Sequence, residues 1–239
     1  NYSKIDPYIR LMRLDSIIPI LLLLWPTCWG LLLASKNLNL SLTANIKIYF
    51  VFIIGIIVSR TLGCVINDVF DRNIDKHVFR TKHRPLASGE LKVKQALYII
   101  FILGMIDFIC AMFLNSYAFN LSFIALLLLS VYPLAKRFFS CPQFFLGAAF
   151  NWGIIMAYAS LQNQVPLEAW ILYASAMCWT ISYDTIYALA DLSDDIRMDI
   201  KSSARLFGNK VVKYIGLLEL LMLTGLLIIG LMYKLNILY

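Results

Sequence analysis

The sequence predicts an all-α membrane protein, a bundle of transmembrane helices. The chain has 239 residues, of which 61% are hydrophobic, and its mean hydropathy is +0.76. Only 15% of the residues are charged, against about 25% in soluble domains. A soluble globule of this size exposes a large surface, which so few polar residues could not cover. Disorder is excluded too, because it requires low hydrophobicity.

Seven apolar segments are candidates for spanning helices, which need about 20 residues each. The first is followed by six more, so we interpret it as a spanning helix and not as a cleaved signal peptide. The fourth is the shortest, and the link of residues 115–117 before it permits only a tight connection. In chain order the segments are 17–34, 46–65, 96–114, 119–132, 144–161, 170–189 and 214–233.

Basic residues concentrate on one side of the predicted bundle. The N-terminal stretch and segments 66–95, 133–143 and 190–213 contain 17 of the 21 Lys and Arg residues. Basic residues collect in cytoplasmic loops, so we expect the N-terminus and these segments in the cytoplasm. This sorting explains the net charge of +7 without nucleic acid, since no basic stripe lies on a soluble domain.

Half of the acidic residues lie in two short segments at predicted cytoplasmic helix ends. The first acidic segment, residues 67–75, reads NDVFDRNID. If the second helix continues through it, Asn67, Asp71 and Asp75 share one face, and Asp68 lies one turn from Asp71. Like charges on one face repel, and a divalent cation would compensate them. Mg²⁺ suits this role because it takes one or two carboxylates and shares substrate phosphates.

The second acidic segment, residues 191–199, reads DLSDDIRMD and repeats the four-residue spacing at Asp191, Asp195 and Asp199. Two such faces at one membrane level could enclose a diphosphate bridged by metal ions, with nearby bases stabilising the leaving group. The alternative is a solvated acidic cap for each segment. A calcium-binding loop fits worse, because its glycine and terminal Glu are absent. No glycine pattern supports nucleotide binding.

These segments resemble the two aspartate motifs of the UbiA family of intramembrane prenyltransferases. NDVFDRNID is similar to the first motif and DLSDDIRMDIKSSARLFG to the second. The flanks RTLGCVINDVFDRNIDKHVFRTKHRPLASGEL, VYPLAKRFF and YDTIYALADLSDD resemble the bacterial branch that acts on 4-hydroxybenzoate. The resemblance implies nine helices around a central cavity. It therefore predicts a single prenyltransferase domain over residues 1–239 that lacks the last two family helices.

The resemblance also implies an activity. A polyprenyl group would pass from polyprenyl diphosphate to the ring carbon ortho to the hydroxyl of 4-hydroxybenzoate, in ubiquinone biosynthesis and with Mg²⁺ as cofactor. The expected location is the bacterial inner membrane, in contact with lipid and with neither nucleic acid nor an obligate protein partner. The menaquinone and haem branches stay open. From another class, a cation-coupled transporter is the main alternative, because membrane acids often mark ion paths.

Site residues follow from the matched motifs and from the demands of the reaction. By resemblance, the metal ligands are Asn67, Asp68, Asp71, Asp75, Asp191 and Asp195. The bases that could bind the diphosphate are Arg72, Lys82, Arg84 and Lys201. A guanidinium suits the carboxylate of the aromatic acceptor, which makes Arg137, near Tyr132, the candidate there. The competing interpretation of Arg137 is a cytoplasmic anchor.

A dry cavity with aromatic walls would protect the allylic cation, because ring faces attract cations. The candidates for cation-stabilising or supporting roles are Trp152, Tyr158, Asp184, Tyr187 and Asp199. For each aromatic residue, ordinary helix packing is the alternative. Asp107 lies in the middle of the third predicted helix and matches no family motif, so we expect it to make a polar contact inside the bundle.

Overall fold

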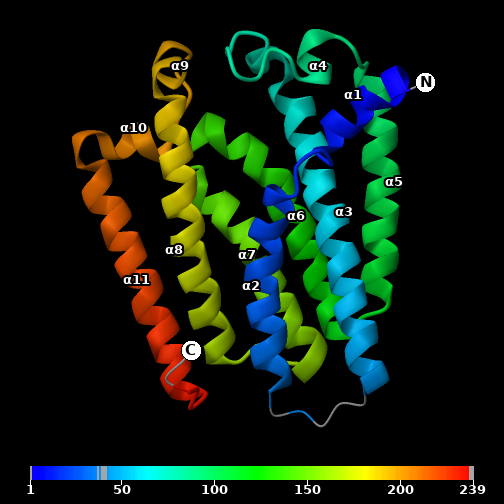
Figure 1. Cartoon of the computed structure of the whole chain (residues 1–239), viewed down its shortest axis with the longest axis vertical. Helices are drawn as coiled ribbons and strands as arrows, with labels where there is room; N and C mark the ends of the chain where they lie inside the picture. The colour runs from blue at the N-terminus through cyan, green and yellow to red at the C-terminus, as the bar shows by residue number, and fades with distance from the viewer. Residues whose placement is uncertain (1, 37, 39–41, 237–239) are drawn as a thin grey trace. The chain divides into compact units, whose positions relative to one another are not determined.

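The computed structural model describes residues 2–36, 38 and 42–236, and these form helices joined by turns, without a strand (Figure 1). Contacts within the chain define two compact units. Unit 1 contains residues 1–24 and 41–114, and unit 2 contains residues 25–40 and 115–239. Helix α2, Ile18–Ser35, contributes to both units.

In unit 1, the long helices α3, Leu42–Asp75, and α5, Val93–Met112, lie side by side (Figure 1). The short helices α1, Tyr2–Met12, and α4, Pro85–Ser88, pack against α3 and against each other. A core of five buried residues joins these helices: Leu11, Val65, Leu86, Leu91 and Ala96. Leu11 is fully buried, so it fixes the end of α1 against α3 and brings the residues that follow α1 to the acidic end of α3.

Unit 2 is built around α8, Leu167–Ala190, which packs against α7, Gln143–Gln162, and α11, Val211–Met232 (Figure 1). Helix α6, Ser116–Phe138, packs on α7, and Asn115 caps α6 by accepting from Ala118 N at 2.8 Å. Three short elements connect α8 to α11: α9, Leu192–Arg197, α10, Ser203–Phe207, and the 3₁₀ turn Gly208–Lys210.

All seven predicted apolar segments are helical, which confirms the all-α class. The fourth is longer than predicted, because α6 continues through Pro133 to Phe138. Of the helices in the described part of the chain, six are long and apolar enough to cross a membrane, one fewer than the seven expected. Helix α8 is not among the six, because Glu168, Asp184 and several Ser, Thr and Tyr residues lower its hydropathy.

A close approach between α2 and α7 depends on Gly153. A Cβ atom at this position would lie 2.1 Å from Thr27 Oγ1, and Thr27 is only 1% exposed. We therefore expect Gly153→Ala to lower the free energy of unfolding by about 1–3 kcal/mol, measured in detergent micelles. Gly216→Ala in α11 is the control, because a Cβ there meets nothing within 4 Å. Equal destabilisation by both substitutions would contradict this account of the packing.

Candidate functional site

The first acidic segment forms the last turns of α3, because α3 continues without interruption to Asp75, which is the condition for its polar residues to share one face. Asp68, Asp71 and Asp75 are 1%, 6% and 5% exposed, respectively. Buried carboxylates are costly unless they are paired or hydrogen-bonded. This end of α3 therefore requires positive charge.

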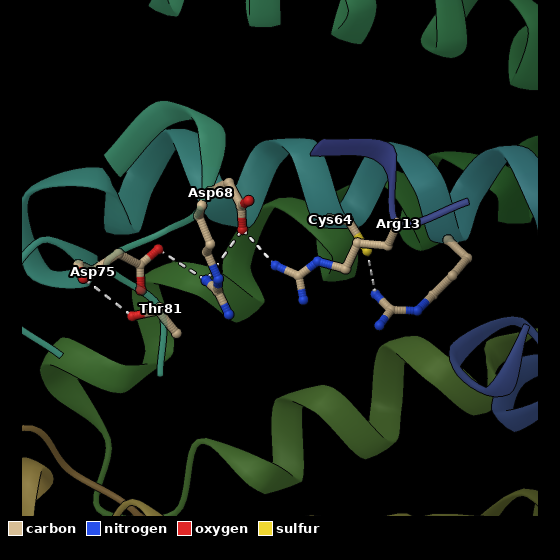
Figure 2. A network of polar contacts seen from close by, with 7 residues as sticks. Arg13, Cys64, Asp68, Asp75 and Thr81 are labelled. Atoms are coloured by element: carbon tan, nitrogen blue, oxygen red, sulfur yellow. Dashed lines mark hydrogen bonds and ion pairs between the residues drawn. The ribbon is translucent and has the colours of Figure 1, made fainter. Parts of the chain in front are cut away.

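Two arginines supply positive charge from outside α3. Arg13 Nη2 donates to Asp68 Oδ1 at 2.7 Å, and Arg84 Nη1 lies 3.2 Å from the same oxygen and 2.8 Å from Asp75 Oδ2. Thr81 Oγ1 donates to the Asp75 carbonyl at 3.2 Å and so holds the turn that leads to Arg84. Figure 2 shows Arg13, Asp68, Asp75 and Thr81 in one chain of polar contacts along α3. We call Arg13, Asp68, Asp75 and Arg84 the α3 ion-pair network.

The guanidinium of Arg13 stays charged in this setting. Burial has the largest single effect and lowers its pKa, but the attraction of Asp68, its hydrogen bond to Arg13, and the nearby Cys64 and Asp75 together raise the pKa above its ordinary value. Leu11 fixes the position of α1, and Arg13 follows α1 in the left-handed backbone region, at φ 53°. The N-terminal helix therefore delivers a permanent positive charge to Asp68.

Two buried oxygens of this segment, Asn67 Oδ1 and Asp68 Oδ2, have no hydrogen-bond donor among the residues that the structure describes. Such oxygens fit a hard cation such as Mg²⁺. Within the described ranges, no group of three acidic, His or Cys side chains makes a ready metal cage. Mg²⁺ needs only one or two carboxylates when waters and phosphate oxygens complete its shell. The segment therefore fits magnesium that arrives together with a phosphate ligand.

The second acidic segment is not one continuous helix, so the expectation that Asp191, Asp195 and Asp199 share a helix face is wrong. Helix α8 ends at Ala190, and Asp191 separates it from α9. Asp195 N donates to Asp191 O at 2.9 Å, so helical spacing holds between these two residues. Asp199 follows α9 in the left-handed region, at φ 51°, because the chain turns back there toward α10. Its exposed carboxylate accepts from Arg205 Nη2 at 2.8 Å.

The predicted diphosphate-binding bases of unit 1 differ in their surroundings. Arg84 belongs to the α3 ion-pair network and already bridges two carboxylates. Arg72 Nη1 donates to the carbonyl of Val69 in its own helix, at 2.7 Å. Lys82 Nζ lies 4.7 Å from the centre of the exposed Phe79 ring. Arg84 thus has two carboxylate contacts, either of which a phosphate oxygen could replace.

Unit 2 contains the fourth predicted diphosphate-binding base, Lys201, and the two predicted acceptor-binding residues, Arg137 and Tyr132, which lie in α6. Lys201 Nζ donates to the Phe138 carbonyl at 2.9 Å, which ties the segment after α9 to the end of α6. Arg137 is exposed one residue before Phe138, and Tyr132 is half-buried further back in the same helix. Lys201 and Arg137 therefore belong to neighbouring parts of the fold.

The predicted aromatic residues mostly make contacts between helices. Trp152 is buried, and its Nε1 donates to the Leu121 carbonyl at 3.1 Å. Tyr158 is fully buried, and its hydroxyl lies 2.9 Å from that of Tyr233. These are the contacts that the packing interpretation predicts. Tyr187, by contrast, is 65% exposed on α8.

Sequence reasoning missed two groups of residues at these segments. Arg13 counted only as one of the basic N-terminal residues, although its partner Asp68 lies 55 positions away. Thr185, next to the half-buried Asp184, bonds Ser203 in a buried cluster after the second acidic segment. The need to compensate several buried acids signals that such partners exist, but a single sequence does not say which residues they are.

The fold and the site define a class of protein: a polytopic α-helical protein with carboxylates and arginines gathered at the end of a long apolar helix. The sequence model of the UbiA prenyltransferase family matches residues 23–239. The chain belongs to this family and is an integral membrane protein.

Two relatives share much of the sequence. The chain is 51% identical over 236 residues to 4-hydroxybenzoate octaprenyltransferase of Francisella tularensis subsp. novicida, covering 99% of this chain and 81% of that protein. It is 45% identical over 229 residues to 4-hydroxybenzoate octaprenyltransferase of Shewanella loihica, covering 96% and 78%. The match to the Francisella protein includes both acidic segments, because it leaves out no more than three residues.

Solved structures of UbiA homologues share the fold. The apo homologue from Aeropyrum pernix K1 superposes with a TM-score of 0.79 at 24% identity, over 91% of this chain and 80% of that chain. A homologue from Archaeoglobus fulgidus, bound to GPP and Mg²⁺, gives a TM-score of 0.74 at 19% identity, over 95% and 78%. At these identities the similarity concerns the fold.

Proposed function

We propose that this protein transfers a polyprenyl group from polyprenyl diphosphate to 4-hydroxybenzoate, in ubiquinone biosynthesis. The observation that carries the proposal is the 51% identity, over 99% of the chain, to a protein named 4-hydroxybenzoate octaprenyltransferase. The buried acids and arginines at the end of α3 suit a reaction that releases diphosphate.

The proposed reaction breaks the allylic carbon–oxygen bond of the prenyl diphosphate, and the electron pair leaves with the diphosphate. The ring carbon ortho to the hydroxyl of 4-hydroxybenzoate supplies the electron pair for the new carbon–carbon bond. That carbon then loses its proton, which restores the aromatic ring. Magnesium, when bound, neutralises the departing diphosphate. The cation formed on the way must be kept from water, which the apolar helices exclude.

We assign magnesium binding to both acidic segments. Arg84 can exchange a carboxylate partner for a phosphate oxygen, because a guanidinium binds both with the same geometry. Arg137 remains the candidate for the acceptor carboxylate. Asp68 or Asp191 could favour a phenolate-like acceptor. The proposed metal ligands are Asn67, Asp68, Asp71, Asp75, Asp191 and Asp195.

We propose the bacterial inner membrane as the location, with the N-terminus and both acidic segments on the cytoplasmic side. The concentration of Lys and Arg in the N-terminal stretch and in segments 66–95, 133–143 and 190–213 supports this orientation. On that side, the acidic segments would be accessible to 4-hydroxybenzoate dissolved in water, while the prenyl chain of the other substrate lies among the lipids.

A panel of aromatic acceptors, tested with and without Mg²⁺, examines the proposal. We expect 4-hydroxybenzoate to be prenylated by the chain in membranes and the product to disappear when a chelator removes the metal. Prenylation of a dihydroxynaphthoate in its place would assign the chain to another branch of the family. Full activity in the presence of the chelator would contradict magnesium dependence.

A further inference from the structure

Three buried polar residues meet where the chain returns from the second acidic segment. Gln143 begins α7, Thr185 lies near the end of α8, and Ser203 begins α10. Thr185 and Ser203 are 0% exposed, and Gln143 is 5% exposed. We call these three residues the return cluster.

The hydrogen bonds of the return cluster have a definite direction. Thr185 Oγ1 donates its one proton to the Ile181 carbonyl at 2.6 Å. In the 2.6 Å contact between the two hydroxyls, Ser203 Oγ must therefore donate to Thr185 Oγ1. The Ser203 backbone N–H donates to Gln143 Oε1 at 2.9 Å. Ser203 thus gives one hydrogen bond to α8 and one to α7, and both are shielded from water.

The return cluster fixes one end of the segment that leads from α8 to α10. Helix α8 fixes the other end, at Ala190. Between these ends, α9 has no buried residue, and in its 3.3 Å Arg197–Asp194 pair the Arg197 side chain is 65% exposed. Lys201, two residues before Ser203, makes the segment's contact with the end of α6. The path of the chain from Asp195 to Lys201 therefore depends on both ends, the end of α8 and the anchored Ser203.

We propose that Gln143, Thr185 and Ser203 are positioning residues, which set the location of the second acidic segment and of Lys201 for binding magnesium diphosphate. This inference rests on the proposed function. The competing account is that the cluster only adds stability, as any buried hydrogen bond does. The two accounts differ in what happens to diphosphate binding when the protein stays folded.

Thr185→Val separates these accounts, because it removes the hydroxyl and keeps the side-chain shape. We expect the affinity for inorganic diphosphate in the presence of magnesium, measured by calorimetry, to fall about tenfold, in the range typical of residues that orient metal ligands. The KM for the prenyl diphosphate should rise to a similar extent, while the KM for 4-hydroxybenzoate stays unchanged. Thr185→Ser keeps the hydroxyl, so its diphosphate affinity and its KM for the prenyl diphosphate should both stay near the wild-type values. Gln143→Glu, which keeps the acceptor for Ser203 N–H, should likewise bind better than Gln143→Leu.

Ser175→Ala is the matched control. Ser175 is a buried hydroxyl of the same helix, and it donates to the Ile171 carbonyl at 2.7 Å, as Thr185 does to that of Ile181. We expect Ser175→Ala to leave diphosphate affinity unchanged, even where its thermal midpoint falls as far as that of Thr185→Val. Equal losses of affinity in these two variants would overturn the positioning role.

Hydrogen exchange of the full chain without metal provides a readout independent of activity. Amides of residues 198–207 should exchange about tenfold faster in Thr185→Val than in wild type, and at the wild-type rate in Ser175→Ala. Unchanged exchange in Thr185→Val would overturn the proposal. Wild-type protein that binds magnesium diphosphate but prenylates no aromatic acceptor would contradict the proposed function alone. The ratio of the diphosphate affinities of Thr185→Val and Ser175→Ala would still decide the positioning role.

Discussion

Asp71→Asn and Asp191→Asn are each expected to reduce the turnover of prenyl transfer by at least about 100-fold. Both substitutions keep the shape of the side chain and remove one of the negative charges to which we assign magnesium binding. Losing one preorganised electrostatic contact to a leaving group typically reduces turnover by about 10²–10³-fold. Turnover should be measured in membranes at saturating prenyl diphosphate and 4-hydroxybenzoate, over a range of Mg²⁺ concentrations.

Asp107→Asn is the control for these two variants. Asp107 is an acid inside α5, outside both acidic segments, and its Oδ2 accepts from Ser59 Oγ at 2.9 Å. The expected polar contact inside the bundle is therefore confirmed. An Asn at this position can still accept from Ser59, so turnover should stay near that of wild type. If folded Asp71→Asn and Asp191→Asn proteins also turn over at the wild-type rate, the two acidic segments do not serve prenyl transfer.

The sequence predicted the elements with strong local signals. Each of the seven apolar segments is a helix. A helix of about 20 apolar residues spans the hydrocarbon core, and it makes all its backbone hydrogen bonds internally. The continuation of α3 through Asp75 meets the condition under which Asn67, Asp71 and Asp75 share one face. The short helices α1, α4 and α10 were missed, because each is too short to contain such an apolar window.

The site was less predictable, because it depends on contacts between distant parts of the chain. The four-residue spacing of Asp191, Asp195 and Asp199 suits a helix, but Asp199 leaves the helix and pairs with Arg205. A spacing of four residues indicates that the side chains would align if the segment were helical. It does not indicate whether the helix continues through the segment. In α3, the helix is extended by packing against α1, α4 and α5, whereas α9 has no buried residue.

Arg84→Ala is expected to lower the free energy of unfolding by about 3–5 kcal/mol, because it leaves buried charges without a partner. Arg84 is 19% exposed, and it pairs with Asp68 and Asp75, whose side chains are 1% and 8% exposed. Arg13 stays with Asp68 in this variant, but Asp75 loses its ion pair with Arg84. Chemical unfolding in detergent, without added metal, measures the effect.

Arg197→Ala is the matched control, because its pair with Asp194 is 3.3 Å long and the Arg197 side chain is 65% exposed. Exposed ion pairs contribute about 0–1 kcal/mol, so this variant should unfold almost as wild type does. Equal losses for Arg84→Ala and Arg197→Ala would show that the α3 ion-pair network contributes no more than a surface pair.

Magnesium should distinguish a purely structural Arg84 from one that shares its carboxylates with a metal. A ligand that binds only the folded state stabilises it in proportion to its occupancy. Arg84→Ala frees acidic oxygens at the end of α3, so added Mg²⁺ should raise its unfolding midpoint further than that of wild type. Arg84→Lys keeps the charge but not the planar fork that reaches two carboxylates, and should give an intermediate response. A midpoint shift of the same size in all three proteins would mean that Arg84 and the metal do not compete for Asp68 and Asp75.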